Sequence, residues 1–123
     1  MPAFHLEDLH HHFAEAFNAG DADALLSLYE PSAILLPMPG QVARGHEEIR
    51  KALGMFLGLK GKITIRTISV TQTDDVGLTH GEWSLTGTGP DGNPLTLGGK
   101  TAEVARRQSD GRWLYVIDNP NLE

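Results

Sequence analysis

The sequence predicts an α+β fold in which three N-terminal helices pack on a curved, bulged, mainly antiparallel sheet. Apolar residues recur every three or four positions through the first half of the chain, and at every second position through much of the second half. The later segments are separated by turn sequences, Pro90-Asp91-Gly92 and Ser109-Asp110-Gly111, that are typical of hairpins. The length of 123 residues predicts a single domain over residues 1–123.

The first half is predicted to hold three helices and one short strand. Residues 4–19 are predicted to form the first helix, because helical spacing places their apolar side chains on one face. These are Leu6, Leu9, Phe13, Ala16 and Phe17. Gly20 ends this helix, and Asp21 caps a second one that includes Tyr29 and stops at Pro31. A short buried strand follows at residues 33–36, and a third helix is expected at residues 46–57.

The alternation of apolar residues in the second half predicts four strands, at residues 62–73, 76–88, 95–108 and 112–119. In the first of them the apolar alternation runs through Ile63 and Ile65 and then slips to Ile68 and Val70. One continuous alternation cannot place all four side chains on the same face. We therefore expect a β-bulge near residues 66–67.

The composition excludes several classes of protein. Ten Lys and Arg against sixteen Asp and Glu give a net charge of −6, which argues against a nucleic-acid partner. There is no cysteine, which excludes disulfides and thiolate chemistry. The longest aliphatic run, at residues 33–36, is far too short to cross a bilayer, and no signal pattern is present. We expect a cytoplasmic protein with no membrane partner.

The histidines and the glycines do not indicate a bound metal or cofactor. His10, His11 and His12 are consecutive, so on a helix they point about 100° apart and cannot hold one ion together. We expect these three side chains on a solvated helix face, and no metal site. No phosphate-binding glycine loop or nucleophile elbow is present, so we also expect no cofactor.

Several short segments resemble, in their order and spacing, the nuclear transport factor 2-like superfamily. They cover nearly the whole chain, at residues 17–25, 28–33, 45–50, 81–85 and 107–113. Within that superfamily the sequence is most similar to SnoaL-like and ketosteroid-isomerase-like proteins. The resemblance implies a cone-shaped fold whose helices and curved sheet enclose a largely apolar pocket.

The same resemblance argues against steroid isomerisation. Ketosteroid isomerase uses a carboxylate base opposite a tyrosine and a protonated carboxylic acid. Aligned through the segments above, this sequence has Pro37 in place of the base and Phe13 in place of the tyrosine, and neither can transfer a proton. An acid is retained only at the third position, where Glu103 stands.

Glu103, Asp118 and Tyr29 are the candidate catalytic residues. If Val116 faces the pocket, strict alternation along the last strand turns Asp118 the same way. Tyr29 matches a tyrosine that the isomerase places beside its pocket. A carboxyl group in an apolar cavity resists ionisation, which suits Glu103 or Asp118 to acid or base work near neutral pH.

A structural role is the alternative for both acids. Glu103 would then pair with Arg107 on the same strand. Asp118 would cap a chain end or meet Arg112 from the neighbouring hairpin. Such contacts would hold strands together without touching a ligand.

Ligand contact is expected from aromatic and aliphatic side chains. Trp83 offers a flat wall for stacking, and Gly81 on the same strand face would leave room beside it, with packing in the core as the alternative for Trp83. Met38, Met55 and Phe56 are expected at the pocket mouth as adaptable apolar surface, with core packing as the alternative. The full set of expected ligand-binding residues is Phe13, Phe17, Met38, Leu53, Phe56, Trp83 and Val116.

These features lead to a functional hypothesis: a pocket protein that binds an apolar small molecule. Its reaction would be that of an isomerase, cyclase or dehydratase that moves protons without a cofactor. A non-catalytic ligand-binding or dimerisation module is the alternative. We also expect a symmetric homodimer, formed through an outer sheet face that carries Thr79, His80, Glu82 and Ser84.

Overall fold

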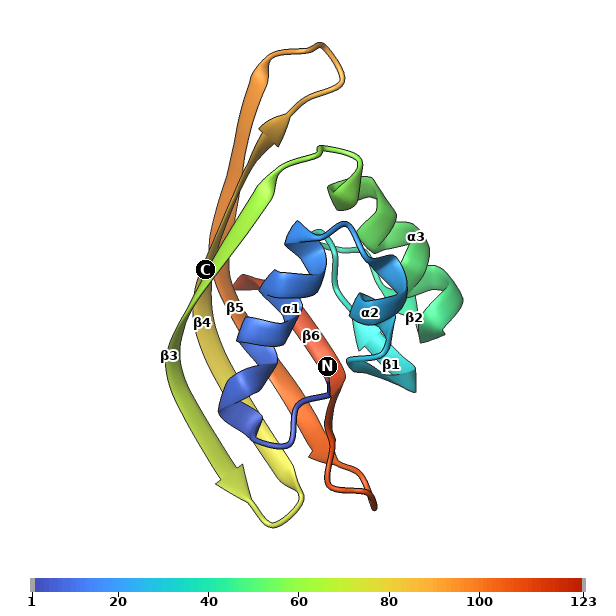
Figure 1. Ribbon diagram of the computed structural model, residues 1–123, viewed down its shortest axis with the longest axis vertical. Coiled ribbons are helices and arrows are strands. Elements are labelled where there is room, and N and C mark those ends of the chain that lie inside the picture. Colours follow the sequence, from blue (N-terminus) through green and yellow to red (C-terminus); the bar gives the residue numbers. More distant parts are fainter. Residues whose placement is uncertain (1, 123) are drawn as a thin grey trace.

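A computed structural model describes residues 2–122 and contains short helices followed by long strands (Figure 1). The helical elements are η1 (Leu6–Asp8), α1 (Leu9–Asn18), α2 (Ala22–Leu26) and α3 (Gly45–Leu57). The strands are β1 (Tyr29–Leu35), β2 (Ala43–Arg44), β3 (Lys62–Thr73), β4 (Val76–Thr88), β5 (Pro94–Arg107) and β6 (Trp113–Leu122). None of the helices in this part of the chain has the length and apolar character needed to cross a bilayer.

All six strands form one curved sheet in the order β2-β1-β6-β5-β4-β3. Every neighbouring pair is antiparallel except β1 and β6, which run parallel. Figure 1 shows α1, α2 and α3 on the same side of this sheet, with α1 lying across the long strands. The predicted α+β class, with N-terminal helices on a mainly antiparallel sheet, is confirmed.

Local sequence signals set the ends of several elements. The Asp21 side chain accepts a hydrogen bond from the Ala24 amide at 3.0 Å, so the predicted cap of the second helix is present. The helix itself is shorter than predicted, because it ends at Leu26 and Tyr29 already begins β1. Pro31 lies within that strand, and the pairing with β6 is irregular between Tyr29 and Ile34, where proline supplies no amide donor.

Register shifts interrupt the sheet at several places, among them the β5–β6 pairing between Lys100 and Ala102. The register of β3 against β4 shifts between Thr67 and Ser69, which leaves Ile68 as the extra residue and confirms the predicted bulge to within a residue or two. A second bulge, not predicted, lies in β6: Ala105 pairs with Tyr115 and Val104 pairs with Ile117, so Val116 is extra. Because of this extra residue, Tyr115 and Asp118 both turn toward the helices although they are three positions apart.

The outer face of the sheet, away from the helices, carries several exposed apolar side chains. Val76, Leu78 and Ile117 are each more than a third exposed there. Thr79, expected on this face, is buried on the opposite side, because it alternates with Leu78 and His80 along β4.

Candidate functional site

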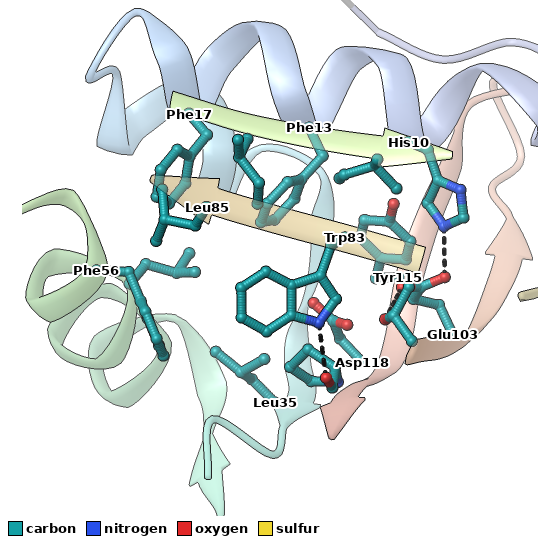
Figure 2. Close-up of a pocket in the computed structure, with 15 residues that line it drawn as sticks. His10, Phe13, Phe17, Leu35, Phe56, Trp83, Leu85, Glu103, Tyr115 and Asp118 are labelled. Atoms are coloured by element: carbon teal, nitrogen blue, oxygen red, sulfur yellow. Dashed lines mark hydrogen bonds and ion pairs between the residues drawn. The ribbon is translucent and has the colours of Figure 1, made fainter. Parts of the chain in front are cut away.

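An apolar cavity lies between α1, α3 and the concave face of the sheet (Figure 2). Its volume is about 60 Å³, smaller than the roughly 150 Å³ that admits a benzene ring. A ring-sized ligand therefore requires side chains at the mouth to move. The lining residues are His10, Phe13, Phe17, Leu35, Leu53, Phe56, Ile63, Ile65, Trp83, Leu85, Thr101, Glu103, Tyr115, Asp118 and Pro120.

Most of the expected ligand-binding residues lie on this cavity. Phe13 and Phe17 come from α1, with ring centroids 6.2 Å apart, while Leu53 and Phe56 come from α3 and Trp83 from β4. The four helical side chains reach the cavity because residues three or four positions apart on a helix share one face.

Three residues expected at the pocket do not line it. Met38 lies in the loop between β1 and β2 with half of its surface exposed, and Met55 is 75% exposed on the outer side of α3. Val116 is the extra residue of the β6 bulge, and Tyr115 takes the inward position in its place. The strict alternation on which the Val116 prediction depended is broken at this residue.

Glu103 is buried on β5 and holds three side-chain partners. Its Oε1 accepts a hydrogen bond from Thr79 Oγ1 at 2.5 Å and lies 2.7 Å from His10 Nε2. Its Oε2 accepts a hydrogen bond from Thr101 Oγ1. The alternative pairing with Arg107 is wrong, because Arg107 binds Asp75 at 2.7 Å instead.

His10 is the main functional candidate that the sequence analysis missed. It was expected in solvent with its two neighbours, yet it is only 4% exposed, while the side chain of His11 is 74% exposed. Its Nδ1 lies 2.8 Å from Thr67 Oγ1, so both ring nitrogens are engaged. The sequence signal for the burial of His10 is its spacing: it stands three residues before Phe13 and seven before Phe17, on the apolar face of α1.

Space beside Gly81 was expected to admit a ligand, but the imidazole of His10 fills it. A Cβ atom at position 81 would lie 3.1 Å from His10 Cε1 and 2.8 Å from the carbonyl oxygen of Arg66. The missing side chain of Gly81 therefore makes room for the pair of His10 and Glu103.

Asp118 lies directly opposite Glu103 in the β5–β6 ladder and is also buried. Its Oδ2 accepts a hydrogen bond from the Tyr29 hydroxyl at 2.5 Å. Burial and, second, the negative charge of Glu103 raise the pKa of Asp118 to about 8, although the hydrogen bond from Tyr29 acts in the opposite direction. The carboxyl group is therefore mainly protonated at neutral pH.

Tyr29 itself stands behind Asp118 and does not line the cavity. Burial, together with the neighbouring Asp118, raises the pKa of Tyr29 well above its usual value, so it remains a hydrogen-bond donor. The alternative in which Asp118 meets Arg112 is wrong, because Arg112 binds Asp110 at 2.7 Å within its own turn.

Trp83 closes one side of the cavity. Its indole N–H donates a hydrogen bond to the carbonyl oxygen of Pro120 at 2.8 Å, so the ring reaches from β4 across β5 to β6 (Figure 2). Gly99, the residue paired with Trp83 on β5, lies beside the ring, and a Cβ atom at that position would contact the indole nitrogen at 3.6 Å. Within residues 2–122, no three His, Asp or Glu side chains are grouped so that they could hold a metal ion.

Comparisons with known proteins identify the family and the fold of this chain. Residues 10–116 match the SnoaL-like domain. A candidate calcium/calmodulin dependent protein kinase II association domain from Xanthomonas campestris is 25% identical, with a TM-score of 0.80 over 96% of this chain and 86% of that one. No curated protein matches the chain.

Two further solved structures support the fold. A ketosteroid isomerase-like protein from Erwinia carotovora atroseptica is 19% identical, with a TM-score of 0.82 over 93% of this chain and 90% of that one. A nuclear transport factor 2 superfamily protein from Salmonella enterica is 16% identical, with a TM-score of 0.77 over 91% of this chain and 84% of that one. At these identities the likeness establishes the architecture alone.

Proposed function

Because the chain belongs to the family of SnoaL-like domains, we propose that it is a cofactor-independent enzyme that moves protons on a mainly apolar small molecule. The reaction would be an isomerisation, cyclisation or dehydration. The observation that carries this proposal is the pair of buried carboxyl groups, Glu103 and Asp118, which stand at paired positions of β5 and β6 and both line a mainly apolar cavity. An acid with a shifted pKa in a cavity, as Asp118 is, is typical of sites for general acid and base catalysis.

The two carboxyl groups are suited to opposite roles. Asp118, with its pKa raised to about 8, is the proton donor near neutral pH. Its Oδ2 is occupied by Tyr29, which leaves Oδ1 to carry the transferable proton. Glu103 is the candidate proton acceptor, and His10, Thr79 and Thr101 orient its two oxygens. Tyr29 is a positioning residue, since it touches Asp118 and not the cavity.

Proton transfer can be tested without knowing the natural substrate. We expect the protein to accelerate exchange of the α-hydrogens of a small ketone, cyclopentanone, for deuterium in D₂O, followed by proton NMR. Asp118→Asn or Glu103→Gln should each lower the catalysed rate by about 10²- to 10⁴-fold, the range for losing one acid or base. The rate should also fall as the pH rises above about 8, where Asp118 loses its proton.

The matched control is Glu82→Gln, which removes an exposed carboxylate on the outer face that pairs with Arg66. Its exchange rate should equal that of the wild type. Exchange no faster than in buffer alone would contradict the proposed chemistry for this class of carbon acid. Equal rates in the wild type and in the Asp118→Asn, Glu103→Gln double variant would exclude the two acids.

An assembly role is the second proposal, and the outer face of the sheet supports it. Val76, Leu78 and Ile117 expose apolar surface there, with Leu78 and Ile117 both beside Val104. A two-fold axis through this face would bury the same patch from each copy. The similarity to a candidate association domain also favours assembly. A dimer is compatible with catalysis, because the cavity lies on the opposite face of the sheet.

We expect a homodimer whose mass by light scattering at micromolar concentration is twice the 13.4 kDa of one chain. Leu78→Lys should convert it to a monomer, because the dimer would bury an unpaired charge. Met55→Lys, a change at a more exposed apolar residue on α3, should leave the dimer intact. A wild-type mass of a single chain would rule out this interface.

A further inference from the structure

Tyr115 lines the cavity, but the proposed reaction assigns it no role. The β6 bulge turns its side chain toward the helices, where it is 1% exposed and lines the cavity. Its ring is held between two aromatic neighbours, with centroids 6.5 Å from Phe13 and 5.3 Å from Tyr29. The position of the Tyr115 ring is therefore set by packing rather than by a hydrogen bond.

The hydroxyl groups of the two tyrosines differ in their surroundings. Tyr29 donates to Asp118, whereas the Tyr115 hydroxyl makes no hydrogen bond to any residue from 2 to 122. In the described part of the chain, every fully enclosed polar side-chain atom has a partner. The Tyr115 hydroxyl thus borders the open space of the cavity, as Figure 2 shows for its ring and oxygen near His10 and Trp83. A polar group in such a place is costly to bury unless a ligand or solvent pairs with it.

The charge of the surroundings limits what this hydroxyl can bind. Burial and then the nearby Glu103 and Asp118 raise the pKa of Tyr115 well above its usual value, so it stays a donor at physiological pH. An anionic ligand would face Glu103, and the imidazole of His10 has both nitrogens engaged. A cationic ligand would lose its hydration in an apolar cavity whose carboxylate, Glu103, already has three partners.

We propose that Tyr115 is the polar anchor of the cavity: its hydroxyl donates a hydrogen bond to an acceptor oxygen, of the carbonyl or ether class, on an uncharged ligand whose remainder is apolar. This inference rests on the ligand pocket of the proposed function and names its ligand class. Tyr115 and Asp118 both belong to β6, three residues apart, so the anchor would hold the acceptor oxygen beside the strand that carries the proposed proton donor. The apolar remainder would then lie against Phe13, Phe56 and Trp83.

The test compares two ligands of the same shape, cyclopentanone and methylenecyclopentane, in which a carbonyl oxygen is replaced by a CH₂ group. Both are titrated by NMR into the wild type and into Tyr115→Phe. We expect the variant to bind the ketone about five- to tenfold more weakly, as for the loss of one neutral hydrogen bond. Its affinity for the hydrocarbon should stay within about twofold. Since the hydroxyl has no partner in the protein, the melting temperature should change little.

Two charged analogues, cyclopentylammonium and cyclopentanecarboxylate, complete the series and should bind the wild type more weakly than the ketone. Tighter binding of either ion, or an equal effect of Tyr115→Phe on ketone and hydrocarbon, would overturn the anchor. If no probe binds, the pocket itself is refuted and the anchor with it. Ketone binding that depends on Tyr115 without deuterium exchange would support the anchor and contradict the proposed reaction, so the two failures are distinguishable.

Discussion

Replacing Asp118 with asparagine is expected to stabilise the protein by about 4 kcal/mol at neutral pH while removing proton transfer at the cavity. The unfolded chain releases this proton near pH 4, whereas the folded chain holds it up to about pH 8. At neutral pH the folded state therefore keeps this proton roughly three pH units above the ordinary pKa of the carboxyl group. Each of these units costs about 1.4 kcal/mol of stability. Asparagine copies the neutral carboxyl without this cost, and its carbonyl oxygen can accept the same hydrogen bond from Tyr29.

The pH dependence follows from the sign of the shift. Because the folded pKa of Asp118 lies above the unfolded one, wild-type stability from this group is complete below about pH 4 and is lost as the pH rises toward about 8. The free-energy gap between variant and wild type should therefore open above about pH 4 and level off near pH 8.

Urea denaturation of both proteins across this pH range measures the gap directly. Glu82→Gln is the control, since this side chain is exposed on the outer face and should show no comparable gap. A variant less stable than the wild type at neutral pH would show that ionised Asp118 holds the fold together. A gap that does not change with pH would exclude the shifted titration as its cause.

Replacing His10 with alanine is expected to have the opposite effect, a loss of about 3 to 5 kcal/mol in the free energy of unfolding. The substitution removes the partner 2.7 Å from Glu103 and leaves that buried carboxyl with two threonine hydroxyls. It also empties the space that the imidazole fills beside Gly81. Both effects destabilise the folded state, and neither has a counterpart in the unfolded chain.

The next residue offers a matched control. His11 has the same side chain on the same helix but is mainly exposed, 3.4 Å from Glu15. His11→Ala should therefore change the free energy of unfolding by no more than about 0.5 kcal/mol. Chemical denaturation of the two single variants gives the comparison. Equal losses would mean that the cost comes from helix propensity rather than from the buried pair with Glu103.

Much of the fold could be predicted because the relevant signals are local. The bounds of β3 and β4 match the predicted residues 62–73 and 76–88, since alternation and turns define long strands well. The hairpin turns hold Gly92 and Gly111 at φ angles of 83° and 91°, as their sequences indicate. The two-residue β2 carries no comparable signal and was missed, because its pairing with β1 is a tertiary contact.

The candidate site was harder to predict because two features depend on tertiary structure. Val116 is the extra residue of the β6 bulge, and only the pairing of β6 with β5 shows this. Alternation alone therefore predicted that Val116 faces inward and overlooked Tyr115. The burial of His10 depends on Glu103, Thr67 and Gly81, which lie far away in sequence. The family resemblance indicated Glu103. Asp118 was predicted by alternation from Val116, which does not face the cavity, and Asp118 turns inward because Val116 is the extra residue of the bulge.

The position of the Trp83 ring beside Gly99 gives the protein a built-in optical reporter. The chain has two tryptophans, and only Trp83 borders the cavity. Trp113 is buried elsewhere, with the Arg107 guanidinium 5.5 Å from its ring centroid. A molecule entering the cavity must displace solvent from the Trp83 indole or disturb its hydrogen bond to Pro120, and either event alters the emission of that ring alone. Compound collections can therefore be screened for cavity binders by intrinsic fluorescence, with Trp83→Phe as the blank.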